Sequence, residues 1–202
     1  MNRVIRYLSH PQVLIDPLKD ISKWSLNDLG KSRVAALADS GNLIGTSAVI
    51  SSAETKAIET ASPLADALGC KMEIREKMHE NDRSATGFLP PDEFEIVAGQ
   101  FFAHPDRSVR GWETAVSAQS RIVDEVRDCL RLHADGDILL VGHGGVGTLL
   151  YCFLASVPIS RLYDQGTGGG GCYFEFRDLK SKPKLGWQPM EILVTQNNRP
   201  LT

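Results

Sequence analysis

The sequence lacks the long hydrophobic runs, clustered cysteines and strong charge imbalance that mark several other classes of protein. Its most apolar stretch, residues 148–154, is far shorter than the roughly 18 residues that a membrane-spanning helix needs. The first ten residues are too few and too polar for the hydrophobic part of a secretory signal. A formal net charge of −3 gives no electrostatic reason to expect nucleic acid or a membrane as partner. We therefore expect neither.

The four cysteines are too widely separated to indicate a metal site. Cys70, Cys129, Cys152 and Cys172 include no Cys-x-x-Cys pair. Isolated cysteines of this kind are typical of reduced, mostly buried side chains in a cytoplasmic protein. The sequence therefore predicts a cytoplasmic location and no zinc cluster.

Strand and helix patterns alternate along the chain, which predicts a single α/β domain over residues 1–202. The strand patterns cover residues 3–8, 48–51, 71–75, 137–141 and 172–176. The helical patterns run from a predicted N-cap at Ser25 to residue 38, over 53–68 and 114–132, and from about residue 146. Such alternation predicts a three-layer sandwich, in which helices cover both faces of a mostly parallel sheet.

Residues 79–112 have a less regular sequence pattern than the rest of the chain. They include Gly87, Pro90, Pro91, Pro105 and Gly111, and they contain one short helical pattern at residues 93–103. Long irregular segments in compact domains commonly carry binding functions. We therefore predict an inserted loop or lid at about residues 79–112.

Two histidines follow predicted strands. His10 comes shortly after the first strand, and His143 follows the strand at 137–141, whose consecutive apolar residues indicate burial on both faces. Folds of this class bind ligands at the carboxyl ends of their strands. A neutral imidazole can attack a phosphoryl group and so divide one displacement into two steps. That chemistry also requires cations, hydrogen-bond donors and an acid that protonates the leaving group.

The sequence offers candidates for each of these groups. Lys56 lies one turn into a predicted helix whose start, near Ser52, supplies a hydroxyl and amides suited to an anion. Gly144 allows the backbone to approach a ligand closely. Glu80, in the irregular stretch, is the candidate acid.

Five segments, taken in chain order, resemble the histidine phosphatase (phosphoglycerate mutase-like) superfamily. They are residues 8–10, 26–38, 51–61, 111–114 and 141–146. The resemblance implies a phosphatase or mutase that needs no metal or other cofactor and acts on a small phosphorylated molecule through a phosphohistidine. It implies His10 as the nucleophile, His143 as a ligand of the transferred phosphate and Glu80 as the proton donor.

The sequence departs from the family pattern where arginine is normally found. The first motif, usually Arg-His-Gly, reads Ser-His-Pro at residues 9–11, and Lys56 replaces the arginine of the second block. Lysine is only a point charge, whereas arginine binds phosphate through two donors. Another cation is needed, and we favour Arg83 over the other arginines of residues 79–112. The predicted phosphate-binding residues are thus Ser9, Ser52, Lys56, Arg83 and Gly144.

Three other interpretations fit parts of the sequence. Without the arginines, the fold could serve as a weak or inactive phosphate-binding or regulatory protein. A nucleotide binder is suggested by Gly142 to Gly147, which match Gly-x-Gly-x-x-Gly and precede Asp164, although too little chain follows for a dinucleotide fold. A metallohydrolase would use His10 and His143 with nearby carboxylates, but neither histidine belongs to a His-x-x-x-His or His-x-Asp spacing. The sequence does not decide the substrate, the choice between phosphatase and mutase, or whether the chain forms a homodimer.

Overall fold

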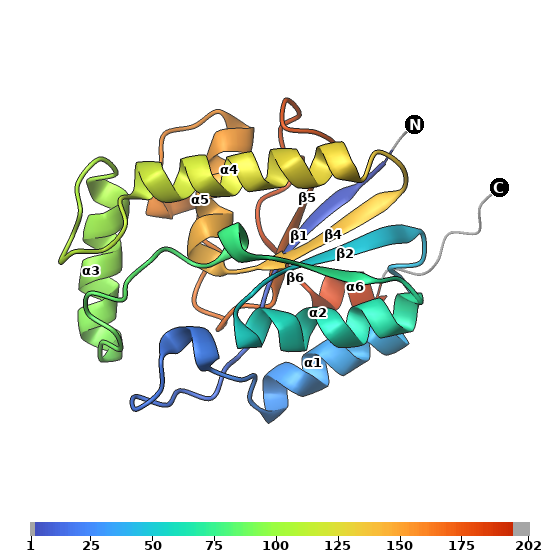
Figure 1. Ribbon diagram of the computed structural model, residues 1–202, viewed down its shortest axis with the longest axis horizontal. Helices are drawn as coiled ribbons and strands as arrows, with labels where there is room; N and C mark the ends of the chain where they lie inside the picture. Colours follow the sequence, from blue (N-terminus) through green and yellow to red (C-terminus); the bar gives the residue numbers. More distant parts are fainter. Residues whose placement is uncertain (1–2, 196–202) are drawn as a thin grey trace.

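The computed structural model describes residues 3–195, which form a six-stranded sheet between two layers of helices (Figure 1). The strands are β1 (Ile5–Ser9), β2 (Thr46–Ser52), β3 (Met72–Arg75), β4 (Asp137–Gly142), β5 (Cys172–Phe176) and β6 (Gln188–Pro189). Their order is β3-β2-β4-β1-β5-β6. Strands β1 to β4 are parallel, and β5 pairs antiparallel with both β1 and β6. The predicted α/β sandwich with a mostly parallel sheet is confirmed.

The helices cover both faces of the sheet. They are α1 (Asp28–Asp39), α2 (Thr55–Leu68), α3 (Pro91–Ala103), α4 (Ala115–Leu132), α5 (Gly144–Ala155) and α6 (Glu191–Thr195), with 3-10 turns η1 (Ile21–Lys23), η2 (Glu76–Met78) and η3 (Arg161–Tyr163). Helices α1, α2 and α6 lie below the sheet in Figure 1, and α4 lies above it. Within residues 3–195, no helix has the length and apolarity to cross a membrane.

The strand β4 shows why the sheet is buried on both faces. Ile138 and Leu140 belong to the core that includes α4 and α5, whereas Leu139 and Val141 belong to the core between the sheet and helices α1 and α2. All four side chains are fully buried, because successive residues of a strand point to opposite faces. Each such side chain stabilises the fold by roughly 1.5–3 kcal/mol relative to exposure. This packing therefore fixes the central strands, and with them the positions of the residues that directly follow each strand in the chain.

The predicted elements occur with shifted ends. The helix cap predicted at Ser25 is wrong: the cap of α1 is Asn27, whose side chain accepts a hydrogen bond from the Gly30 amide at 2.9 Å. Ser25 lies in extended chain, where its carbonyl accepts from the Leu14 amide at 2.9 Å, and this pairing delays the helix. Helix α5 begins before residue 146, at Gly144, since a carboxylate from another segment binds its first amides.

Residues 79–112 lie outside the sheet and contain α3, which stands at one end of the molecule in Figure 1. Val97 and Phe101 of α3 are buried in the core. The Trp112 ring is also buried, and its indole N–H donates to Thr86 Oγ1 at 2.8 Å. Packing therefore fixes this segment against the domain, and its role as a lid stays a prediction.

The corrected cap can be tested by substitution. We expect Asn27→Ala to lower the free energy of unfolding by about 1 kcal/mol, because the Gly30 amide loses its acceptor. Urea denaturation would measure the loss. Ser25→Ala is the matched control and should change the stability by less than about 0.5 kcal/mol. Equal losses in the two variants would contradict the assignment of Asn27.

Candidate active site

Parallel pairing of β1 with β4 brings the two predicted histidines together. Ser9 is opposite Gly142 in the register, and the amide of His10 donates to the Gly142 carbonyl at 2.9 Å. Each histidine therefore leaves the carboxyl end of its strand beside the other. The ring centroids of His10 and His143 are 5.3 Å apart, with the planes inclined at 69°.

The imidazole of His10 is oriented by its own backbone. Its Nδ1 lies 2.8 Å from the Pro11 carbonyl, which can only accept a hydrogen bond, so Nδ1 carries the proton and Nε2 holds the lone pair. Burial, together with the Lys56 ammonium, lowers the pKa of His10 to about 4. The ring is therefore neutral at pH 7, which is the state that a nucleophilic imidazole requires.

His143 is completely buried at the start of α5. Its Nε2 is 2.8 Å from Ser52 Oγ, at the end of β2, and 3.5 Å from Glu54 Oε1. Burial lowers the pKa of His143 well below the usual value, although the Glu54 carboxylate opposes the shift. The second imidazole is thus also held in its neutral form.

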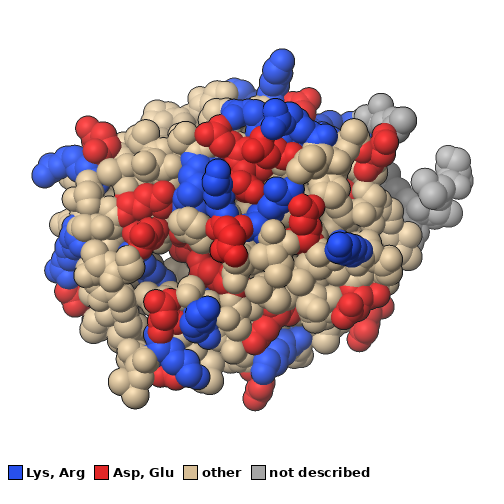
Figure 2. Space-filling view, in the orientation of Figure 1, with Lys and Arg blue, Asp and Glu red and all other residues tan. Residues whose placement is uncertain are grey.

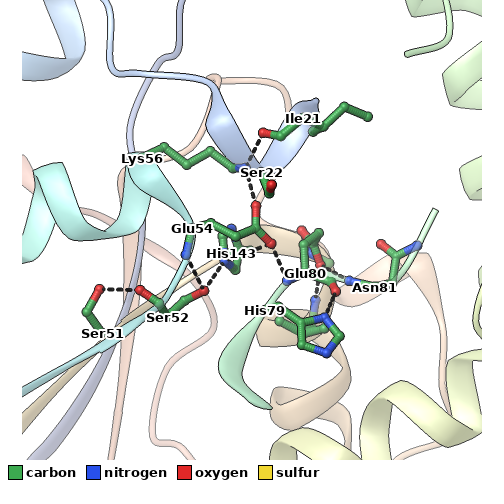
Figure 3. Close-up of polar contacts among 12 residues, drawn as sticks. Ile21, Ser22, Ser51, Ser52, Glu54, Lys56, His79, Glu80, Asn81 and His143 are labelled. Atoms are coloured by element: carbon green, nitrogen blue, oxygen red, sulfur yellow. Dashed lines mark hydrogen bonds and ion pairs between the residues drawn. The ribbon is translucent and has the colours of Figure 1, made fainter. Parts of the chain in front are cut away.

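Glu54, which the sequence reasoning missed, lies at the centre of the site (Figure 3). One carboxylate oxygen forms an ion pair with the Lys56 ammonium, and the other accepts a hydrogen bond from the Glu80 amide at 2.8 Å. Burial alone would raise the pKa of Glu54, but the Lys56 ammonium and the hydrogen bond from the Glu80 amide lower it below its usual value. A permanent negative charge therefore stands beside His143.

Lys56 is only 3% exposed and is fully engaged by neighbours. Besides the ion pair with Glu54, its Nζ donates to the Ile21 carbonyl of η1 at 2.9 Å. Figure 3 shows Lys56 and Ile21 on one side of the Glu54 carboxylate and Glu80 on the other. The positive charge of Lys56 is thus neutralised within the protein.

Glu80 lies where residues 79–112 leave the sheet, and it binds the first turn of α5. Its two carboxylate oxygens accept from the amides of Gly145 and Val146, at 3.0 and 2.8 Å. The positive end of a helix favours a carboxylate at this place. This contact fixes the predicted proton donor beside the helix that His143 begins.

A cavity of about 860 Å³ opens beside these groups. Among its lining residues are His10, Glu80, Asn81, Arg83, Gly144 and Gln165. The Arg83 guanidinium lies over the Phe94 ring of α3 at 4.8 Å, whereas Arg110 is paired with Glu93. Of the arginines considered from sequence, Arg83 is thus the one that lines this cavity.

Not every predicted phosphate ligand points into this cavity. Ser52 and Lys56 do not line it and are buried next to His143 and Glu54. The hydroxyl of Ser9 instead contacts Gln165 Oε1 at 2.5 Å and the backbone of Cys172. Ser9 therefore touches the loop that precedes β5.

Asn81 was also missed from the sequence. It is 9% exposed, and its Nδ2 has no hydrogen-bond partner within the described part of the chain. It lines both the 860 Å³ cavity and a neighbouring one of about 410 Å³. Only its place directly after Glu80 could have signalled a role.

The comparisons with known proteins agree with this geometry. A family model described as the histidine phosphatase superfamily (branch 1) matches residues 18–173. The chain belongs to the histidine phosphatase superfamily. His10 precedes the matched range, while Lys56, Glu80 and His143 lie inside it. No curated protein matches the sequence significantly.

Solved structures of similar fold include several phosphatases. The mycobacterial glucosyl-3-phosphoglycerate phosphatase is 18% identical, with a TM-score of 0.70 over 92% of this chain and 96% of that chain. The Bacillus stearothermophilus protein YhfR is 16% identical, with a TM-score of 0.74 over 92% and 96% of the two chains. The phosphoserine phosphatase of Entamoeba histolytica is 15% identical, with a TM-score of 0.73 over 95% and 99%. At these identities the likeness establishes the fold.

The nucleotide-binding interpretation of Gly142 to Gly147 loses its structural support in this superfamily member. Asp164 follows the 3-10 turn η3 rather than a strand, so it does not stand where a ribose-binding acid would. The Glu80 carboxylate occupies the helix amides that a pyrophosphate would use. Across residues 3–195, no group of three or more His, Cys, Asp or Glu side chains is arranged to hold a metal ion.

Charge is balanced over the surface seen in Figure 2, where acidic and basic side chains are interspersed. This face therefore offers an anion no large patch of positive charge alone. Within the site, the Glu54 carboxylate offsets the Lys56 ammonium.

Removal of the Glu54 charge should expose the latent positive charge of Lys56. We expect Glu54→Gln to lower the free energy of unfolding by about 3 kcal/mol, because a buried ammonium loses its partner. Inorganic phosphate should restore more stability to this variant than it adds to the wild type, which thermal denaturation with and without phosphate would measure. Glu54→Gln combined with Lys56→Gln is the control. An equal phosphate effect in Glu54→Gln and wild type would refute the prediction.

The two neutral histidines make stability depend on pH. The pKa of His10 falls from its usual 6.5 to about 4 on folding, so between these values the unfolded chain binds more protons. The free energy of unfolding should therefore decrease as pH falls from 6.5 to 4, and the shift at His143 acts in the same direction. Urea denaturation at pH 7 and pH 5 would measure the decrease. A smaller decrease is expected in His10→Asn; an unchanged one would contradict the assigned pKa.

Proposed function

We propose that this protein is a phosphomonoester hydrolase that acts on a small phosphorylated molecule through a phosphohistidine on His10. The observation that carries the proposal is the placement of a neutral His10 at a large cavity, with the lone pair on Nε2. The ring centroid of His10 is 5.3 Å from that of His143. Membership of the superfamily and the phosphatases of the same fold support the reaction class.

The reaction follows from the positions of these groups. The Nε2 lone pair of His10 forms a bond to phosphorus as the ester P–O bond breaks, and Glu80 transfers a proton to the leaving oxygen. This step requires Glu80 to bind a proton when substrate binds, against the preference of the α5 amides for the carboxylate. Glu80 then accepts a proton from water, whose oxygen attacks phosphorus as the P–N bond breaks. Inorganic phosphate leaves, and both His10 and the acid are restored.

The phosphoryl group would be held by donors that converge on the cavity. The Gly144 amide, at the first position of α5, has no acceptor within its helix, and Arg83 brings a positive charge to the same cavity. His143, whose ring centroid is 5.3 Å from that of His10, would bind the phosphoryl group, while Ser52 holds the His143 ring through its Nε2. Lys56 adds positive charge to the extent that Glu54 does not cancel it.

The leaving group would lie against residues 79–112. The cavity of about 860 Å³ falls in the range of small-molecule sites, and Phe94 and Trp112 contribute to its wall. We propose that this inserted segment selects the substrate by shape. The named substrates of structural neighbours, such as phosphoserine, fit such a volume but belong to those proteins.

Glu54 favours a second candidate function, a phosphate-binding protein with little turnover. Its buried carboxylate lowers the positive potential where the transition state needs it most. The two candidates share the same pocket but differ in whether His10 is phosphorylated.

Substitution of His10 separates the two functions. Wild-type protein should release phosphate from p-nitrophenyl phosphate, and His10→Ala should lose at least about a thousandfold in kcat/KM because the nucleophile is gone. A radiolabelled substrate should leave an acid-labile label on wild type and none on the variant. His104→Ala is the control, since His104 is the exposed C-cap of α3. Equal background activity in wild type and His10→Ala would exclude hydrolysis and favour the binding protein.

A further inference from the structure

We propose that Gln165 binds the phosphoryl group of the substrate and that Ser9 positions it for this task. This inference rests on the proposed function and adds to it two residues from parts of the chain that meet only in the fold. Together they supply a directed donor beside the position where the family carries the arginine of its first motif.

The hydrogen-bond pattern of Ser9 determines how the Gln165 amide is turned. The Ser9 hydroxyl accepts from the Cys172 amide at 3.1 Å, so its single proton is available for donation. Gln165 Oε1 is the nearer acceptor at 2.5 Å, compared with 3.2 Å for the Cys172 carbonyl. Because the oxygen of the Gln165 side chain faces Ser9, its NH₂ group faces away from Ser9.

That NH₂ group lies against Gly144 at the start of α5. A Cβ atom built on Gly144 would fall 2.1 Å from Gln165 Nε2, so the approach is possible only because residue 144 is glycine. The Gly144 amide is at the first position of the helix, where N–H groups have no intrahelical acceptor. Gln165 Nε2 and the helix N-terminus are thus neighbouring donors.

Gln165, Gly144 and His10 line the same cavity. A phosphoryl group in reach of His10 Nε2 and the Gly144 amide would therefore lie beside the Gln165 amide. A neutral donor does not replace the charge of a guanidinium, but a donor already oriented binds an anion at little further cost in side-chain entropy.

The backbone around Gln165 is anchored independently of its side chain. The Gln165 amide donates to Asp164 Oδ1 at 2.7 Å, and the same oxygen accepts from Thr148 Oγ1 of α5 at 3.2 Å. Arg161 adds an ion pair to Asp164 at 3.8 Å. Substitution of the Gln165 side chain should consequently leave this loop in place.

The first arm of the test is the affinity for inorganic phosphate, measured by calorimetry together with kcat and KM for p-nitrophenyl phosphate. Gln165→Met, which removes the donor at similar size, should weaken phosphate binding about tenfold. Gln165→Glu should weaken it further, because a carboxylate oxygen replaces the NH₂ group beside the anion. Gly144→Ala should weaken it as well, since the added Cβ displaces Nε2.

Gly168→Ala is the matched control on the same loop, because a Cβ at Gly168 meets nothing within 4 Å. It should bind phosphate like the wild type. Thermal denaturation without phosphate should give similar stability for Gln165→Met and the wild type, which shows that a loss of affinity is not a loss of fold.

The positioning role of Ser9 requires a double-mutant cycle. Ser9→Ala alone should weaken phosphate binding, but it should have no further effect in the Gln165→Met background, where no NH₂ group is left to orient. A purely structural role of Ser9 would give additive losses and would overturn the positioning claim.

The outcomes also separate this inference from the proposed function. His10-dependent turnover in wild type, with unchanged phosphate affinity and KM in Gln165→Met and Gln165→Glu, would overturn the role of Gln165 alone. Absence of both His10-dependent turnover and phosphate binding in wild type would overturn the proposed function and this inference with it. Phosphate binding without turnover, weakened in both Gln165 variants, would support the role of Gln165 in a binding protein.

Discussion

The parallel pairing of β1 with β4 is the constraint on which the site depends. The last residues of these strands are in register, and the His10 amide extends the ladder by donating to Gly142. Buried side chains on both faces of β4 keep the two strands from moving against each other. Two imidazoles that are far apart in the chain are thereby held with their centroids 5.3 Å apart, and both stay neutral because the same packing removes them from water.

Around this pair, the protein balances charge internally. Glu54 binds the Lys56 ammonium, and Glu80 binds N-terminal amides of α5. Both carboxylates are therefore held by positive groups of the site, and a substrate must share those groups with them. In the proposed function, this balance makes the strength of phosphate binding depend on oriented neutral donors.

Much of the fold could be predicted because its signals are local. The apolar run of β4, the helical period of α4 and the glycine that ends α2 each determine an element through neighbouring residues. The start of α1 could not be predicted in this way, since Ser25 is held in extended chain by pairing with Leu14. The short strand β6 was missed for a similar reason: it is a two-residue strand that exists through pairing with β5.

The sequence by itself determined the family, the α/β architecture and the candidate histidines, because these depend on residue types at fixed offsets along the chain. Only the tertiary structure decided which charges neutralise one another. Glu54 is two residues from Lys56 in sequence. Its contacts with His143 and Glu80 exist because three separate segments of the chain meet at the carboxyl ends of the strands. Likewise, the direction of Ser9 toward Gln165 depends on β5 lying beside β1. Electrostatic and hydrogen-bond partners act over a few ångströms of space, and sequence distance does not encode that separation.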